Sequence, residues 1–301
     1  MEQKIDSRSL WAWTAAAMFA PVAQSLGSVS WVWVLAVGIL AGGLWLLGIR
    51  ATEKGRSCGK PVAVLQITSL IFAASVASSR SAACWITAKP GWTIPVVLLV
   101  LAACSATQGT RAGARCGAVL YWFVAGIFLL LAAFCLPDVE PRWLLPDRTA
   151  PEGETVTILL IPMAALLLPR EGKSKAWPWA AAILLLAVTV SLLTFGTLSP
   201  RVASQTEGAF FQTARGISIL GVAERFEALV AAAMTVSWFC LLSLFLTAAG
   251  HLAEHLHPAW GKPAVWLSAA LAALIMPWTS NLSPWLSAAL AFLLWFLPCR
   301  K

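Results

Sequence analysis

The chain has 301 residues, of which 59% are hydrophobic and only 11% are charged, and its formal net charge is +8. A soluble domain carries about 25% charged residues, so this composition excludes an ordinary soluble protein. The positive charge does not indicate a nucleic-acid partner, because the basic residues lie in short gaps between apolar segments. There they set membrane topology and meet anionic lipid headgroups.

Ten apolar segments of roughly membrane-spanning length follow one another along the chain. A transmembrane helix needs about 20 mostly apolar residues, with about 17 as the lower bound. The predicted spans are residues 9–26, 30–49, 61–86, 92–107, 113–136, 152–168, 177–196, 222–249, 262–277 and 283–298. The sequence therefore predicts an all-α polytopic membrane protein with one transmembrane domain, residues 1–301.

Lysine and arginine gather in every second gap between the predicted spans. The gaps on the side of the N-terminus hold Lys4, Arg8, Arg50, Lys54, Arg56, Lys60, Arg111, Arg115, Arg170, Lys173, Lys175, Lys262, Arg300 and Lys301. The opposite gaps hold Lys89, Arg142, Arg148, Arg201 and Arg215. Because cytoplasmic loops of membrane proteins are enriched in Lys and Arg, this imbalance of 14 to 5 predicts that both termini are cytoplasmic.

The first and sixth predicted spans are short, and each carries a proline beyond its midpoint, Pro21 and Pro162. An interior proline removes a backbone donor and clashes with the preceding turn. Opened backbone at membrane depth is tolerated only where it is buried in protein or lines a cavity. Two interrupted segments at matching positions favour an inverted-repeat transporter fold with its ligand site at the breaks. The alternative, that the prolines only kink two ordinary helices, stays open at this point.

A charged motif ahead of the eighth span carries a family resemblance. After an Ile-rich stretch that begins at Arg215, the chain reads Glu224-Arg225-Phe226-Glu227. The other matching features are Lys4-Ile5-Asp6-Ser7-Arg8, Pro90-x-Trp92, Gly109, Arg115, Trp143-Leu-Leu-Pro146 and the basic loop after Pro169. Together these features resemble the spore germination permease family, the B subunits of GerA-type nutrient germinant receptors. The chain looks like a divergent member, since Ala20-Pro21-Val22 stands where the family has a glycine-rich break.

The resemblance implies membership of the amino acid–polyamine–organocation superfamily. It therefore implies a LeuT-like five-plus-five inverted repeat with discontinuous first and sixth helices. Repeat one would cover about residues 9–136 and repeat two about residues 152–298. The resemblance further implies a multi-pass protein in the inner membrane of the spore, with the receptor A and C subunits as partners.

We expect a ligand cavity between the two interrupted segments, because pockets are mostly apolar with a few oriented polar groups. The expected lining residues are Phe19, Ala20, Pro21, Gln24, Ile161, Pro162 and Met163, with Ser75, Ser79, Arg80 and Trp238 on the walls. Arg80 is interpreted either as the ligand of a carboxylate or as a structurally paired arginine that snorkels to the interface.

Three charges, Glu224, Arg225 and Glu227, lie within one turn at the start of the eighth span. Charges near lipid depth are expensive unless they are paired or hydrated. Two interpretations stay open: a gate or subunit contact, for which Arg215 is a candidate partner, and an interfacial anchor of the helix.

The segment His251-Leu-Ala-Glu254-His255 formally matches a zinc-peptidase pattern. A catalytic zinc needs a third protein ligand, and no Asp or Glu follows Glu254. We therefore expect no metal site, no cofactor and no enzymatic activity.

The leading hypothesis is a germinant-receptor subunit that senses a small nutrient, an amino acid in the first place, and helps to trigger germination. One alternative is a secondary amino-acid transporter of the same fold. The other is a scaffold paralogue that binds no ligand and holds partner subunits in the membrane.

Overall fold

The computed structural model of the chain describes residues 5–53, 59–81, 92–144, 158, 161–171, 175–206, 208–216 and 226–279. Its α-helices are α1 (Ser7–Ser25), α2 (Trp31–Glu53), α3 (Lys60–Ser81), α4 (Thr93–Thr107), α5 (Thr110–Cys135), α7 (Trp177–Leu198), α8 (Pro200–Gln205), α9 (Ala209–Gly216), α10 (Phe226–Leu256) and α11 (Gly261–Thr279). The 3₁₀-helices are η2 (Leu136–Asp138), η3 (Pro141–Leu144), η4 (Ile161–Leu167) and η5 (Pro258–Trp260), and the strands are β1 (Ile5–Asp6) and β2 (Arg170–Glu171). The described residues confirm the all-α class, since the two strands have only two residues each.

Six segments are long and apolar enough to cross a membrane: Trp31–Arg50, Lys60–Ser81, Thr110–Asp138, Trp177–Leu198, Phe226–Leu256 and Pro258–Thr279. α4 is a shorter apolar helix. These segments confirm a polytopic membrane protein. The predicted tenth span, 283–298, lies outside the described residues, and so do residues 152–157, 159 and 160 of the sixth, 152–168. The count of ten spans therefore stays a prediction.

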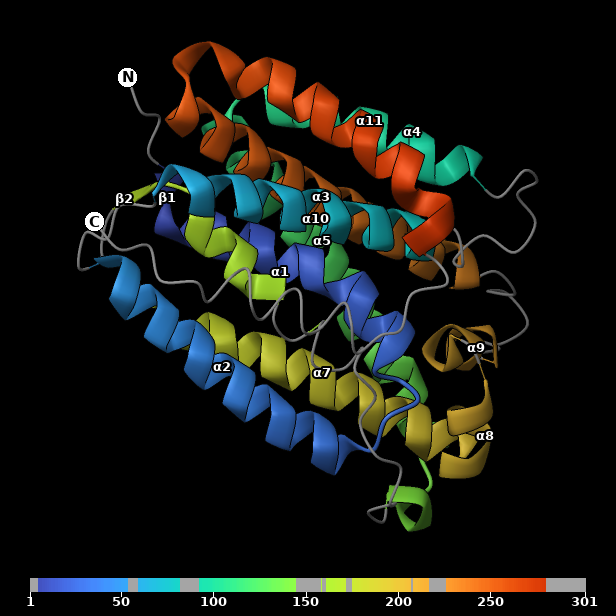
Figure 1. The fold of residues 1–301 in the computed structure, drawn as a ribbon. Helices are drawn as coiled ribbons and strands as arrows, with labels where there is room; N and C mark the ends of the chain where they lie inside the picture. Colours follow the sequence, from blue (N-terminus) through green and yellow to red (C-terminus); the bar gives the residue numbers. More distant parts are fainter. Residues whose placement is uncertain are drawn as a thin grey trace.

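The long helices run side by side and alternate in direction, which gives the bundle two distinct ends (Figure 1). The first, here called the β end, holds β1, β2, the end of α2 and the start of α11. The second, here called the α9 end, holds α8, α9 and the start of α10. Consecutive long helices thus run in opposite directions between the two ends of the bundle. Short connections require this arrangement, because they can join only helix ends that lie at the same end of the bundle.

Two helices, α1 and α10, form the centre of the bundle. Every residue of α1 from Leu10 to Ala23 is buried, and α10 is in contact with α1, α3, α4, α5 and α11. α1 is not among the six long apolar segments, although it is almost completely buried. Its surroundings are protein rather than lipid, so its lower hydropathy does not exclude a place inside the bundle.

The outer helices expose apolar side chains. Leu40 on α2 is 68% exposed and Trp122 on α5 is 75% exposed. Large exposed apolar faces of this kind are surfaces for lipid or for another protein. They place α2 and α5 at the periphery of the bundle.

The side chain of Trp13 fixes the distance between α1 and α5. A Cβ atom added at Gly117 would lie 2.3 Å from Cγ and Cδ1 of Trp13, and one added at Gly113 would lie 2.9 Å from its Cη2. The indole N–H of Trp13 donates a hydrogen bond to the Cys240 carbonyl on α10 at 3.1 Å. Two glycines one turn apart therefore form a slot on α5, and the ring that fills it also bonds to α10.

The expectation of a discontinuous first helix is wrong. α1 continues through Pro21 to Ser25, and the Leu26 N–H donates to the Val22 carbonyl at 2.9 Å beyond the proline. A proline removes one backbone hydrogen bond without forcing the chain out of helical dihedrals, so a packed helix can continue through it. In the sixth segment the described residues form η4, a 3₁₀-helix with Pro162 near its start.

We predict that Gly117→Ala destabilises the protein, because the added methyl group overlaps the Trp13 ring. Overpacking of this kind costs about 1–3 kcal/mol. Gly126→Ala on the same helix is the control, because nothing lies within 4 Å of its added Cβ. Thermal unfolding of the detergent-solubilised protein checks the pair, and equal midpoints for the two variants would contradict the slot.

Candidate functional site

The turn of α1 before Pro21 bonds to a neighbouring helix. The Ala20 N–H donates to the Ser237 Oγ of α10 at 2.8 Å. Pro21 has no N–H, so it cannot donate the bond that the Ala17 carbonyl would receive in an uninterrupted helix. Ala20, Pro21 and Ser237 are all buried. The helix is therefore continuous in path but altered in its hydrogen bonding at the point where the sequence predicted a break.

Aromatic rings cover this turn on the side of the α9 end. Phe19 packs edge-on against Phe128 of α5 at 5.8 Å between ring centroids and against Phe210 of α9 at 6.3 Å. Phe19 is 1% exposed and Phe210 is fully buried. The short helix α9 thus places a phenylalanine directly over a predicted ligand-lining residue, a contact that sequence reasoning missed.

Gln24 connects α1 to the end of α3. Its Nε2 donates to the Arg80 carbonyl at 3.2 Å, while its Oε1 is buried and has no hydrogen-bond partner among the described residues. The structure therefore brings together two residues, Gln24 and Arg80, that the sequence assigned to the same site. The bond uses the backbone of Arg80 and leaves the chemical role of its guanidinium open.

The serine side chains of the third span that were predicted to line the ligand site already form hydrogen bonds within the protein. The Ser75 hydroxyl is 3.0 Å from that of Thr279 on α11, and the Ser79 hydroxyl donates to the Val76 carbonyl of its own helix. Ser75 therefore connects α3 to α11. Trp238 on α10 is 3% exposed, and its indole nitrogen is buried without a partner in the described part of the chain.

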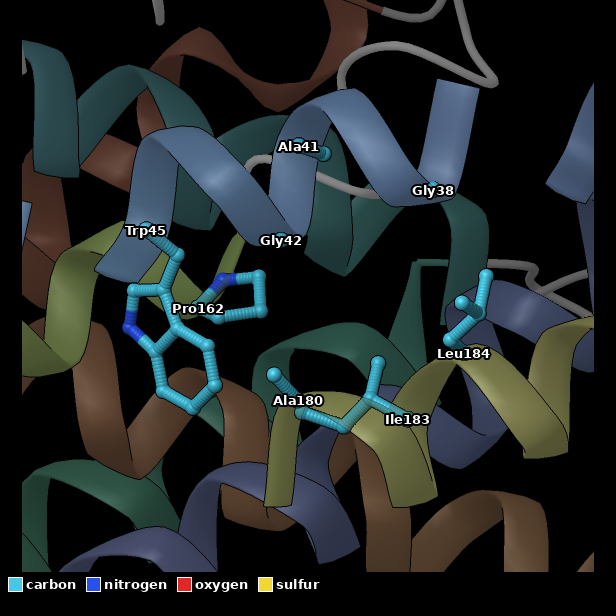
Figure 2. A pocket seen from close by; sticks show the side chains of 8 residues that line it. All are labelled: Gly38, Ala41, Gly42, Trp45, Pro162, Ala180, Ile183 and Leu184. Carbon is cyan, nitrogen blue, oxygen red and sulfur yellow. The ribbon is translucent and has the colours of Figure 1, made fainter. Parts of the chain in front are cut away.

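The described part of the sixth segment is packed into the bundle. Ile161, Pro162 and Met163 are buried, and η4 is in contact with α1, α2 and α10. Pro162 lines a cavity of about 20 Å³, close to the space that one water molecule occupies. The other lining residues are Gly38, Ala41, Gly42 and Trp45 of α2 and Ala180, Ile183 and Leu184 of α7 (Figure 2).

This cavity differs from the expected one, because α2 and α7 supply its walls and no residue of α1 lines it. Of the predicted ligand-lining residues only Pro162 belongs to it. The sequence did contain a signal for this packing, because small residues such as Gly38, Ala41 and Gly42 allow a neighbouring helix to approach α2 closely. The predicted site between α1 and η4 stays a prediction.

Of the three predicted gate residues, Glu224 and Arg225 lie outside the described residues. Glu227, in the first turn of α10, accepts a hydrogen bond from the Arg215 Nε at 2.8 Å. This pair ties the end of α9 to the start of α10. The Thr197 and Thr213 hydroxyls, 3.2 Å apart, tie α9 to α7. These contacts hold α9, and with it Phe210, over the bundle.

The His251–His255 segment lies at the end of α10. Among the described residues, no three His, Cys, Asp or Glu side chains lie together in a way that would hold a metal ion. His257 Nδ1 accepts a hydrogen bond from the Ala259 N–H at 3.3 Å, which caps η5.

The sequence matches no protein-family model and no curated protein. The proposal for function therefore depends on the residues of this chain and on the motif resemblance described above.

We predict that Ser237→Ala destabilises the protein, because it removes the buried hydrogen bond that joins Ala20 of α1 to α10. A hydrogen bond of this kind contributes about 0.5–1.5 kcal/mol. Thr235→Val is the matched control, since the Thr235 hydroxyl donates to the Ala231 carbonyl of its own helix at 2.7 Å rather than to another helix of the described structure. Thermal unfolding in detergent is the measurement. A Ser237→Ala protein no less stable than Thr235→Val would show that the contact between α1 and α10 does not matter.

Proposed function

We propose that this chain is the membrane subunit of a spore germinant receptor and senses a small nutrient, an amino acid, within the bundle. The observation that carries the proposal is the altered backbone of α1 at Ala20 and Pro21, buried at the centre and bonded to Ser237. Polar backbone inside a membrane protein is tolerated where protein or a cavity shelters it, and ligand sites of transporter folds lie at such places.

The packing of the helices supports an inverted repeat. In a five-plus-five repeat, α1 corresponds to the η4 segment, α2 to α7, α3 to α10 and α4 to α11. A contact within the bundle should then have a counterpart. α3 packs against α11, and its counterpart is α10 against α4; α2 packs against η4, and its counterpart is α7 against α1. The α3–α4 contact likewise matches the α10–α11 contact. These pairs support repeats over residues 9–136 and 152–298, whereas the contacts of α10 with α1 and with η4 have no comparable counterpart at α3 among the described residues.

The distribution of charge supports an orientation with the β end in the cytoplasm. The elements that meet there carry Arg8, Arg50, Lys60, Arg111, Arg115, Arg170 and Lys262. At the α9 end the described cations include Arg142, Arg201 and Arg215. Under the positive-inside rule the N-terminus is cytoplasmic. With ten spans the C-terminus lies on the same side.

Polar groups of α1 and α10 are candidates for holding the two charged ends of a zwitterion. The Ala17 carbonyl, which loses its helical donor to Pro21, and the Gln24 Oε1, buried without a partner among the described residues, lie about two turns apart. Either one is a candidate acceptor for a ligand ammonium group. The buried indole N–H of Trp238 is a donor for a carboxylate. Bound ligand would change the balance between conformations only through unequal affinity for them, and the A and C subunits would respond to that change.

The two alternatives differ from this proposal in what happens at the same site. A secondary transporter would release the amino acid on the cytoplasmic side. A scaffold would bind nothing, and the tight packing of Phe19 and Ala20, 1% and 0% exposed, is compatible with a scaffold as well as with a receptor without bound ligand.

The proposal predicts that deletion of the gene abolishes germination in response to at least one amino acid and that the intact gene restores it. Purified protein in liposomes should bind that amino acid without accumulating it. Uptake against a gradient would identify a transporter instead. Normal germination of the deletion strain with every nutrient would contradict the receptor assignment.

We also predict that Arg215→Gln and Glu227→Gln each reduce the germination response severalfold at normal protein abundance. The two side chains are 39% and 41% exposed, so their pairing adds only about 0–1 kcal/mol to stability. A large loss of response would therefore reflect gating or a subunit contact rather than folding.

Arg142→Gln is the control, because Arg142 donates to Glu140 in an exposed pair at the same end, a bond that raises the pKa of its guanidinium. It should leave the response unchanged. An unchanged response per molecule in all three variants would show that the Arg215–Glu227 pair only anchors α10.

A further inference from the structure

The segment before α1 pairs with the segment after η4 at the β end. β1 and β2 are parallel, with Ile5 opposite Arg170 and Asp6 opposite Glu171. The Ile5 N–H also donates to the Pro169 carbonyl at 3.2 Å, and the Ser7 hydroxyl donates to the Glu171 carbonyl at 2.8 Å. The start of α1 is thus held by backbone bonds to a stretch of chain more than 160 residues away.

Arg170 extends this contact to a third element. Its Nη2 donates to the Ile49 carbonyl near the end of α2 at 3.1 Å. Its guanidinium lies over the Trp11 ring of α1, 5.8 Å from the centroid, and Trp11 packs edge-on against Trp45 of α2 at 5.1 Å. A hydrogen bond from a charged donor and a cation–π contact on a desolvated ring are both stronger than their neutral or exposed counterparts. One side chain therefore joins α1, α2 and β2.

The same end of α1 seals the interior. Trp13 is 1% exposed, fills the Gly113–Gly117 slot of α5 and bonds to the carbonyl of Cys240, whose own side chain is fully buried. Access to Cys240 from the β end therefore requires that this part of α1 move away from α5 and α10. Because Trp11 and Trp13 lie two residues apart, a contact that holds Trp11 also holds Trp13.

We propose that the β1–β2 pair and Arg170 form a latch that keeps the β end of the bundle closed by holding α1 against α2 and the segment after η4. Release of the latch frees the start of α1 and exposes the α1–α5–α10 junction to the aqueous side. The latch depends on no ligand, so it holds for a receptor, a transporter or a scaffold alike. It joins the segment before the first span to the segment after η4, so any conformational change that separates those two segments has to break it.

The test measures maleimide labelling of two native cysteines in inside-out membrane vesicles. Cys240 reports on the junction, and Cys135, 1% exposed near the end of α5 by η2, reports on the opposite end. The remaining cysteines, Cys58, Cys84, Cys104, Cys116 and Cys299, are replaced by alanine. Loss of a hydrogen bond from a charged group changes an opening equilibrium by about tenfold or more. Arg170→Gln should therefore raise the labelling rate of Cys240 about tenfold and leave that of Cys135 unchanged.

Two further variants separate the latch from a general effect of charge or folding. Ile5→Pro removes the N–H that bonds to Pro169 and should also raise Cys240 labelling. Arg8→Gln removes an exposed cation from the first turn of α1 and should have no effect. Asp6→Cys with Glu171→Cys, partners in the β pair, should form a disulfide on oxidation and suppress Cys240 labelling even with Arg170→Gln.

Unchanged Cys240 labelling in both Arg170→Gln and Ile5→Pro would overturn the proposal. An equal rise at Cys135 would also overturn it, because it would indicate loss of the fold rather than opening of one end. If Arg170→Gln does not accumulate in membranes, the cross-linked pair decides alone: oxidation that leaves Cys240 labelling as fast as in the reduced protein contradicts the latch.

Discussion

The structure depends on the neighbouring helices that bury the backbone of α1 where Pro21 alters its hydrogen bonding. Pro21 deprives α1 of one backbone hydrogen bond, which lipid could not replace. The helix nevertheless continues to Ser25, every residue from Leu10 to Ala23 is buried, and the Ala20 N–H next to the proline bonds to Ser237 of α10. A helix that needs such surroundings has to lie at the centre, and the long apolar helices then lie around it.

Contacts at both ends keep α1 in that position. At the β end, Arg170 and the β1–β2 pair hold its start, and Trp13 fills the slot on α5. At the α9 end, Phe210 packs on Phe19, and α9 is tied down by the Arg215–Glu227 pair. Among the described residues, both ends of α1 are therefore held by contacts to other elements. Movement of α1 during a response to ligand would have to break one of these two sets of contacts.

The parts of the fold that depend on composition could be predicted from the sequence. Helices such as α2, α5 and α10 follow from runs of apolar residues, and Arg215 was identified as a candidate partner for the charged cluster. The continuity of α1 could not be predicted, because a proline inside a helix is compatible with either a kink or a break, and the neighbours that enclose Pro21, such as Ser237, are more than 200 residues away. The β1–β2 pair involves only two residues on each side, too few to leave a sequence pattern. The cavity beside Pro162 escaped prediction because α2 and α7, rather than α1, supply its walls.

The burial of α1 is tested most directly by a photoactivatable lipid probe that inserts into side chains next to the hydrocarbon core. Protein in liposomes would be irradiated, digested and analysed by mass spectrometry. Peptides that contain Leu40 of α2 and Trp122 of α5, both strongly exposed, should be labelled, while the peptide from Leu10 to Ala23 should not. Labelling of the α1 peptide as strong as that of α2 and α5 would contradict the account, because it would place the Pro21 backbone in lipid.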